Sequence, residues 1–417
     1  LMAARELLKK GKSVTILEAR NRIGGRIHTM QDDGFNIPAE AGAEFIHGRL
    51  PVTLKLVKEA GLKHYTLEGK MIRDQGDKLS KDSGLTKGWP LVTKRLKQLT
   101  QDMSIADFLQ KYFNDEQHVG IKKSVKHFAE GYNAADISVA SAIALREEWL
   151  GNDAGGQYRI RGGYRGVTDF LMKEITHHGA DVQLSAVVKK IQWKPGSVTV
   201  LTEEGLKFFA PKVIITISLG VLKQDESERG AITFSPAIPS YRQALTDLGY
   251  GHVIKILLQF HELFWTRTAL KKRTGVNMKN MGFLFTEEII PTWWTQLPEK
   301  IPLLTGWIGG PEAKKLSAFS EEIILQKSLK TLAAVFKMSI FEIKEQLSHS
   351  HIANWSADEY SRGAYSFETL KRTAAAKILN TPIESTIYFS GEGLYNGSAG
   401  GTVEAALVSG NLVTDKI

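Results

Sequence analysis

The chain contains no cysteine. Disulfide bonds, thiolate metal ligands and cysteine nucleophiles are therefore excluded. It also lacks any apolar run of about 18 residues, the length that a transmembrane helix needs, so no membrane partner is expected. No H-x-x-E-H pattern surrounds the histidine pair 177–178, and we expect no metal site. The lack of cysteine fits a reducing compartment, and we expect a cytoplasmic location.

Length and charge narrow the class further. A chain of 417 residues exceeds one ordinary core, so two domains are expected. Apolar residues make up 42% and charged residues 24%, which is typical of globular proteins. The net charge is +9, but the basic residues are scattered along the chain. This pattern favours a solvated basic surface, and we expect no nucleic-acid partner.

The N-terminal segment is typical of part of a dinucleotide-binding unit. Residues 1–8 have helical spacing, Gly11 ends the helix, and residues 13–17 follow as a strand that ends at Glu18. An acidic residue there hydrogen-bonds the adenosine ribose, about 20 residues after a glycine-rich turn. The first strand and that turn are therefore expected upstream of Leu1, where a targeting signal is not assessable. If they are absent from the protein, we expect weak cofactor binding and little activity.

Gly24, Gly25 and Arg26 strengthen this interpretation. Two glycines let the backbone approach a pyrophosphate, and the arginine neutralises it. Because Glu18 and Arg20 stand at fixed spacing before them, the whole E-A-R-x-R-x-G-G-R pattern favours a cofactor site over a plain turn.

Further elements follow from apolar patterns. The polar, glycine-rich residues 70–90 predict a surface excursion. Residues 213–217 predict a strand buried on both faces, and residues 248–260 predict one apolar strand that carries Lys255. The remaining expected elements are strands at 27–30, 182–184, 187–193, 197–202, 207–210, 282–286, 303–308 and 387–390, and helices at 52–60, 320–336 and 403–412.

Six segments together resemble the flavin-dependent amine oxidases, the family of monoamine oxidases, polyamine oxidases and histone lysine demethylases. These segments are EARNRIGGR (18–26), AGAEFIHG (41–48), FAEGYNAAD (128–136), LGYGHVIKILLQF (248–260), SRGAYS (361–366) and FSGEGLYNGSAGGTVEAALVSG (389–410).

The resemblance implies an α/β fold with a Rossmann-like FAD-binding domain built from discontinuous segments, residues 1–66, 160–235 and 383–417. An α+β substrate domain with a mixed sheet would take residues 67–159 and 236–382.

FAD rather than NAD is implied, because the last segment resembles the family's second flavin contact. The final helix, which opens at Gly400, would face the anionic edge of the flavin with its N-terminal amides. The cofactor-binding residues implied by the resemblance are Glu18, Arg20, Gly24, Gly25, Arg26, Gly42, Ala43, Val187, Trp355, Gly391, Glu392, Gly401, Thr402 and Val403.

Three residues are implied in catalysis. Burying an unpaired lysine in an apolar strand costs free energy unless its ammonium snorkels to an edge. The resemblance implies that Lys255 holds a water molecule against flavin N5. Tyr365 resembles one wall of an aromatic cage that orients the amine. Thr402 stands where monoamine oxidases have a second tyrosine wall, which favours the polyamine-oxidase branch. Ala364 replaces the cysteine that binds flavin covalently in monoamine oxidases, so a non-covalent FAD is expected.

Substrate contacts are assigned to Glu44, His47 and Trp307. The first two could bind a distant amine of an extended polycation, or they could only order their loop. Trp307 could line the substrate site or belong to the core.

The implied activity is oxidation of an amine C–N bond to an imine, with O2 reduced to H2O2, on a polyamine or related primary or secondary amine. An L-amino-acid oxidase remains an alternative, although no arginine matches a carboxylate clamp. So does a non-catalytic flavoprotein scaffold that binds a basic partner, against which Lys255 and Tyr365 speak together. A carotenoid-type desaturase shares the nucleotide motif but not these two residues. The amine itself and the oligomeric state are not determined by these patterns.

Overall fold

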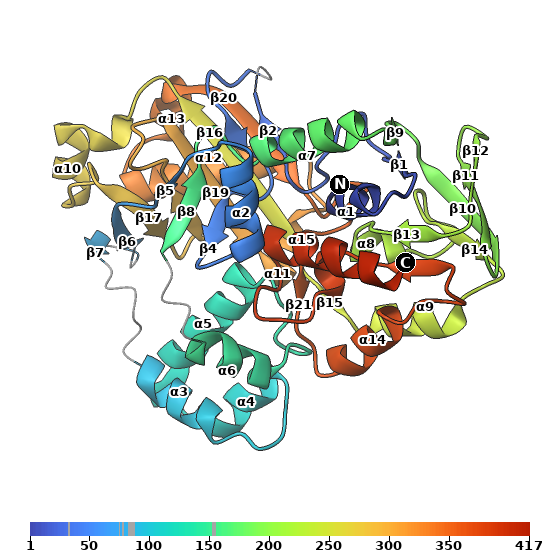
Figure 1. The fold of residues 1–417 in the computed structure, drawn as a ribbon. Helices are drawn as coiled ribbons and strands as arrows, with labels where there is room; N and C mark the ends of the chain where they lie inside the picture. Colours follow the sequence, from blue (N-terminus) through green and yellow to red (C-terminus); the bar gives the residue numbers. More distant parts are fainter. Residues whose placement is uncertain (32–33, 75, 77–78, 82–87, 152–155) are drawn as a thin grey trace.

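The computed structural model describes residues 1–31, 34–74, 76, 79–81, 88–151 and 156–417. Its fold is mixed α/β, with separate sheets and a helical lobe below them in the view of Figure 1. Residues far apart in sequence meet at the centre, where the N-terminal helix lies beside the C-terminal helix (Figure 1). None of the helices in the described residues has the length and apolar character needed to cross a bilayer.

A seven-stranded mixed sheet forms the larger layer. Its neighbours are antiparallel except for one parallel pair, β17 with β6. In spatial order its strands are β20 (Leu347–Asn354), β16 (Val253–Phe260), β19 (Leu303–Gly309), β18 (Thr292–Trp294), β17 (Met281–Phe285), β6 (Lys70–Asp74) and β7 (Leu79–Lys81).

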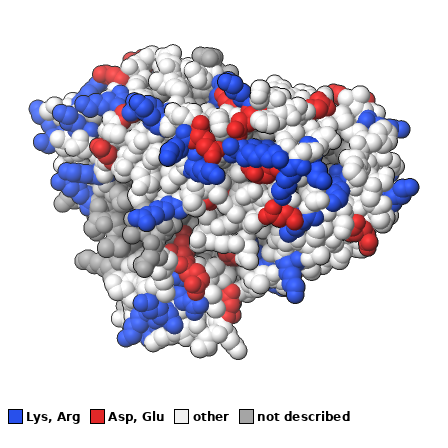
Figure 2. Space-filling view, in the orientation of Figure 1, with Lys and Arg blue, Asp and Glu red and all other residues white. Residues whose placement is uncertain are grey.

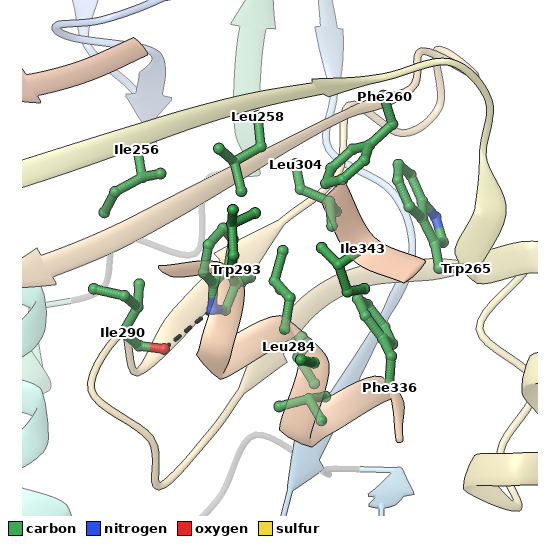
Figure 3. Close-up of a cluster of buried hydrophobic side chains, with 14 of the residues drawn as sticks. Ile256, Leu258, Phe260, Trp265, Leu284, Ile290, Trp293, Leu304, Phe336 and Ile343 are labelled. Atoms are coloured by element: carbon green, nitrogen blue, oxygen red, sulfur yellow. Dashed lines mark hydrogen bonds between the residues drawn. The ribbon is translucent and has the colours of Figure 1, made fainter. Parts of the chain in front are cut away.

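The interior strand β16 is buried along its whole length, as an apolar strand covered on both faces should be. Figure 3 shows Ile256 and Leu258 on one face, packed with Trp293 and with Phe336 of helix α12 (Glu321–Phe336). The alternate residues lie on the opposite face, because side chains of a strand alternate. Lys255 is one of them, so strand periodicity alone turns it away from this core.

The second group of sheets comes from the segments expected to bind the nucleotide. Short parallel pairs join β1 (Thr15–Leu17) to β9 (Asp181–Gln183) and β13 (Val213–Ile215) to β22 (Ile387–Phe389). A four-stranded sheet has the order β12 (Lys207–Ala210), β11 (Ser197–Thr202), β10 (Val188–Lys194) and β14 (Thr233–Ser235). Helix α1 (Met2–Lys9) packs against α7 (Arg165–His177) and α15 (Val403–Leu412).

The remaining elements connect or cover these layers. Helices α3 to α6 share a core of their own and form the helical lobe (Figure 1). The bounds of the lobe helices are α3 (Trp89–Lys97), α4 (Ile105–Tyr112), α5 (Val119–Lys126) and α6 (Ala142–Leu150), and a π-helical turn, His127–Tyr132, follows α5. The small sheets are β2 (Thr29–Met30) with β3 (Ala39–Glu40), β4 (Phe45–His47) with β8 (Gln157–Ile160) and β5 (His64–Thr66), and β15 (Gly249–Tyr250) with β21 (Ser366–Phe367). The other α-helices are α2 (Pro51–Glu59), α8 (Leu219–Leu222), α9 (Pro239–Thr246), α10 (Thr268–Thr274), α11 (Gly310–Leu316), α13 (Ile340–Gln346) and α14 (Arg372–Leu379).

Three local predictions differ from the structure. Part of the segment 70–90 is not a surface excursion, because β6 and β7 extend the large sheet and bury Ile72 and Leu79; residues 75, 77–78 and 82–87 lie outside the described residues. The apolar run 248–260 is two strands, since β15 pairs with β21 whereas β16 pairs with β19 and β20. In β13 only Ile215 is fully buried, because the strand has three residues and lies in a two-stranded sheet.

Both expected domains supply sheets of their own. The large sheet uses strands from residues 70–81, 253–309 and 347–354, all within the expected substrate segments. The expected boundary at residue 160 falls at the end of β8, which pairs with β4 and β5. The exact division stays a prediction.

Candidate active site

One large cavity runs between the layers, with a volume of about 2620 Å³. Pockets for drug-sized ligands measure roughly 300–1,000 Å³, so this cavity has room for a large cofactor together with a substrate. Every residue that the sequence assigned to cofactor, catalysis or substrate lines it. The structure therefore brings the whole predicted set to one place.

The nucleotide end of the cavity begins where β1 ends. Glu18 accepts a hydrogen bond from the backbone N–H of Arg20 at 2.9 Å, which bends the chain directly after the strand. Arg20 makes two hydrogen bonds to Asp358, at 2.6 and 2.9 Å, and a third to Ser361. Because Asp358 follows the large sheet in sequence, this bidentate pair ties the two layers together at the cavity wall.

Glycine backbone lines the next part of the cavity. Gly25 has φ +57°, and a Cβ placed there would meet no atom within 4 Å. Gly391 has φ +136°, and its nearest atom would be Thr216 O at 3.9 Å. Both positions need glycine for backbone conformation and leave the main chain open toward the cavity. A ligand can therefore approach the backbone closely here, as a pyrophosphate requires.

Arg26 joins three motifs at the middle of the cavity. Its guanidinium donates to Oε2 of Glu392 at 3.0 Å and to the backbone oxygen of Ala364. The other oxygen of Glu392 accepts from the backbone N–H of Ser366 at 2.8 Å. Glu392 is almost fully buried, so this network holds the N-terminal, SRGAYS and C-terminal motifs in a common arrangement.

The N-terminus of α15 borders the same cavity. Thr402 is its N-cap, because the hydroxyl accepts a hydrogen bond from the N–H of Ala405 at 3.3 Å. Gly401 has φ +72° and lies so close to Tyr365 that a Cβ would stand 3.2 Å from the ring. A helix N-terminus, open glycine backbone and an acidic residue after a strand are donor and acceptor groups that fit a flavin nucleotide.

Lys255 reaches the cavity from β16 and is 1% exposed. Its Nζ donates to Oε2 of Glu44 at 2.6 Å and to the backbone oxygen of Gly42 at 3.0 Å. The ammonium also lies 5.5 Å from the ring centre of Trp294. An ammonium has three donors, and these two hydrogen bonds leave one for a group in the cavity.

Glu44 is the centre of a buried charge cluster. Its Oε1 accepts from Nε of Arg159 at 2.8 Å and from Nε1 of Trp294 at 3.0 Å. Burial alone would raise the pKa of Glu44, but Lys255 and Arg159 outweigh it and hold the pKa below its usual value. Since both oxygens are occupied by protein groups, the contacts support the alternative in which Glu44 orders its surroundings rather than binding substrate.

Aromatic rings form the facing wall. The ring of Tyr365 lies 6.3 Å from that of Trp307 at an angle of 20°, and Trp307 lies 6.0 Å from Trp294. Tyr365 donates its hydroxyl to the backbone oxygen of Tyr132 at 2.6 Å, and Trp307 donates to Gly131 O at 2.7 Å. Both bonds hold the π-helical turn, a conformation that occurs frequently at functional sites. Trp307 thus faces the cavity as part of this wall.

His47 lies beside this wall without a charged partner among its described contacts. Its Nδ1 is 3.2 Å from the hydroxyl of Tyr132, and its ring packs edge-on against Phe45 and Tyr132. Burial lowers the pKa of His47 to about 4. The imidazole is therefore neutral at pH 7 and would not repel a cationic substrate.

Sequence reasoning missed several members of the site. Arg159 gave no signal, because nothing local pairs residue 159 with residue 44. Trp294 was assigned no role from the sequence, yet it hydrogen-bonds Glu44. Tyr132 and Asn133 lay inside the FAEGYNAAD motif without a role, and Glu148 lay in an unremarkable helix. The π-helical turn, which contains Tyr132 and is followed by Asn133, is the feature that marks this region as part of the site, and it is visible only in the structure.

Comparisons with known proteins agree with this geometry. A family model for flavin containing amine oxidoreductase matches residues 1–417. Polyamine oxidase 2 of Arabidopsis thaliana is 27% identical over 447 aligned residues, which cover 100% of this chain and 85% of that protein. Lysine-specific histone demethylase 1B of Mus musculus is 25% identical, with 100% of this chain and 51% of the relative covered.

Solved structures show the same fold. Putrescine oxidase bound to putrescine has a TM-score of 0.77 at 19% identity, and the match covers 99% of this chain and 95% of that one. Cyclohexylamine oxidase from Brevibacterium oxydans IH-35A has a TM-score of 0.77 at 18% identity, with the same coverage. Because the family model spans the whole chain and its motif residues converge on one cavity, this chain belongs to the flavin-containing amine oxidoreductases and is a flavin-dependent amine oxidase.

Proposed function

We propose that the chain oxidises a polyamine or a related primary or secondary amine, with non-covalently bound FAD and with O2 as the electron acceptor that becomes H2O2. The observation that carries the proposal is the meeting of Lys255, the Tyr365–Trp307 wall and the glycine-lined backbone in one cavity. Support for a polyamine also comes from the resemblance to polyamine oxidase 2 of Arabidopsis thaliana.

Different residues of this chain would bind the nucleotide, face the flavin ring and orient the amine. Glu18, Gly25 and Gly391 would hold the nucleotide part of FAD, and the start of α15 would face the flavin ring. When bound, FAD supplies the capacity to accept two electrons from the C–N bond. The aromatic wall would orient the amine by cation–π attraction and exclude water around the reacting carbon. The third N–H of Lys255 would hold a water molecule at the flavin.

The contacts disfavour a substrate carboxylate at this site. Arg20, Arg26 and Arg372 line the cavity, and each is already paired with a carboxylate, Asp358, Glu392 and Glu368 respectively. A substrate carboxylate would have to compete with these ion pairs for the same guanidinium groups. An L-amino-acid oxidase is accordingly less well supported than an amine oxidase.

A peroxide assay tests the proposed function. The flavin-loaded protein is mixed with spermine, spermidine, putrescine, benzylamine or L-amino acids, and H2O2 formation is measured. We expect peroxide with the polyamines. Turnover of amino acids alone, or bleaching of the flavin absorbance by no amine, would contradict the proposal.

A further inference from the structure

The helical lobe supplies a carboxylate to the cavity. Glu148 stands on α6, lines the cavity together with Tyr132 and Asn133, and is accessible to solvent within it. Its Oε2 accepts a hydrogen bond from Nδ2 of Asn133 at 2.7 Å. Because Asn133 directly follows the π-helical turn, this bond fixes Glu148 to the turn that also holds Tyr365.

Glu148 is close enough to the aromatic wall to act on it electrostatically. Tyr365 bonds the backbone of Tyr132, and the next residue, Asn133, bonds Glu148. Burial first, and the charge of Glu148 second, raise the pKa of Tyr132 to about 12. The pKa of Tyr365 is raised chiefly by burial, with smaller contributions from Tyr132 and Glu148. The carboxylate is therefore near Tyr365 and belongs to α6 of the helical lobe.

Three other carboxylates that line the cavity already have cationic partners. Glu44 is held by Lys255 and Arg159, Glu392 by Arg26, and Glu368 by Arg372. The hydrogen-bond partner of Glu148 is a neutral amide, and the protein atoms that enclose this part of the cavity raise the pKa of Glu148 to about 7 by partial burial. A carboxylate in this setting gains most from a cation that enters the cavity.

Aromatic rings surround the approach to Glu148. Tyr132 stacks on Phe128 with ring centres 5.2 Å apart, and Phe128 lies 5.4 Å from the ring of Trp149. Tyr132 and Trp149 both line the cavity. Such rings accept an alkyl chain and attract a cation on their faces.

We propose that Glu148, oriented by Asn133, binds a second ammonium group of the substrate, while the reacting amine lies at Tyr365. The inference rests on the proposed function and deepens it, since it selects diamines and polyamines over monoamines. It also moves the expected recognition of a distant amine from Glu44, whose oxygens are occupied, to Glu148.

The test compares two ligands that differ by one ammonium group, putrescine and n-butylamine, on the flavin-loaded wild type and on Glu148→Gln. The amide replacement keeps the size of the side chain and removes its charge. A hydrogen bond to a charged group contributes enough for a change of about tenfold or more. The ratio of kcat/KM for putrescine to that for butylamine is expected to fall by at least about tenfold in Glu148→Gln.

Two further variants sharpen the result. Asn133→Ala should lower the same ratio by a smaller factor, because it loosens Glu148 without removing its charge. Glu116→Gln, an exposed carboxylate of the same lobe outside the cavity lining, is the matched control and should leave the ratio at the wild-type value. Thermal unfolding of each variant confirms that it is folded.

The outcomes separate the two proposals. If the wild type oxidises amines but Glu148→Gln keeps the wild-type ratio, the second-ammonium site is wrong and the amine oxidase stands. If Glu148→Gln weakens both ligands equally, Glu148 shapes the cavity and does not select a diamine, which also overturns the inference. If the wild type oxidises neither of these amines nor spermine or spermidine, the proposed function fails and this inference fails with it.

Discussion

The ammonium of Lys255 lies 2.6 Å from a carboxylate oxygen of Glu44, and both side chains are almost completely buried. Three distant segments meet here, since Arg159 binds the other oxygen of Glu44. One carboxylate thus balances two cations in the interior. Lys255, which the sequence places in an apolar strand, therefore forms an ion pair with Glu44 that also fixes the direction of its side chain. Its hydrogen bonds to Glu44 and Gly42 leave one N–H donor for the cavity.

Replacement of Glu44 by Gln should strongly destabilise the fold. The change leaves Lys255 and Arg159 buried beside each other without a counter-charge, and breaking a buried pair in this way costs about 3–5 kcal/mol. The free energy of unfolding in urea measures the effect. The matched control is Glu312→Gln, which removes an exposed ion pair with Lys315 and should leave the unfolding free energy unchanged. Equal stability of the two variants would contradict this account of the cluster.

Replacement of Lys255 by Met should separate stability from function. The variant keeps the Glu44–Arg159 pair, so it should be less destabilised than Glu44→Gln. Reoxidation of the amine-treated flavin by O2 should slow, because the proposed water at the flavin loses its ammonium donor. Stopped-flow absorbance in the flavin band measures this rate. An unchanged rate would show that Lys255 has no part in the oxygen reaction.

The flavin should be released intact when the protein is denatured. Ala364 stands where a covalent link would need a thiol, and its backbone oxygen is occupied by Arg26. After acid precipitation, we expect the yellow colour and the FAD fluorescence in the supernatant. Flavin that stays with the precipitated chain would contradict non-covalent binding.

Glu40 should make the stability depend on pH. Burial raises the pKa of Glu40 to about 7, and its oxygens accept hydrogen bonds from Tyr164 N–H at 2.5 Å and from Thr29 at 3.0 Å. The folded state therefore holds a proton that the unfolded chain releases near its ordinary pKa of 4.5. The stabilisation is complete below that value and is lost as the pH rises through about 7.

Thermal or urea unfolding of the wild type and Glu40→Gln between pH 4.5 and 8 tests this. Glutamine resembles the protonated acid and does not titrate. Relative to Glu40→Gln, the wild type should lose up to roughly 3 kcal/mol over this range. A difference that does not vary with pH would show that Glu40 is ionised at its ordinary pKa in the folded protein.

Surface charge agrees with the scattered basic residues of the sequence. Lys and Arg on the face shown in Figure 2 are interspersed with Asp and Glu and do not form one continuous stripe. Charge of this kind supplies solvation over that face.

Local patterns predicted most elements, because each pattern reflects a nearby physical cause. The last helix begins at Val403 and ends at Leu412 as expected, since Thr402 caps it. The helix at 321–336 begins after Ser320 for the same reason. The segment 70–90 was misjudged because a short, polar strand owes its place to a neighbour, here β17, and not to its own composition.

The sequence by itself determined the family, the positions of the glycines that line the cavity and the apolar strand that carries Lys255, because these depend on residue type at short spacing. Only the tertiary structure decided which charges meet. Glu44, Arg159 and Lys255 come from three separate strands or loops, and Glu148 of α6 is held at the cavity by a hydrogen bond from Asn133, which follows the π-helical turn. Pairing across such distances in sequence follows from how sheets and helices pack, and no local pattern records it.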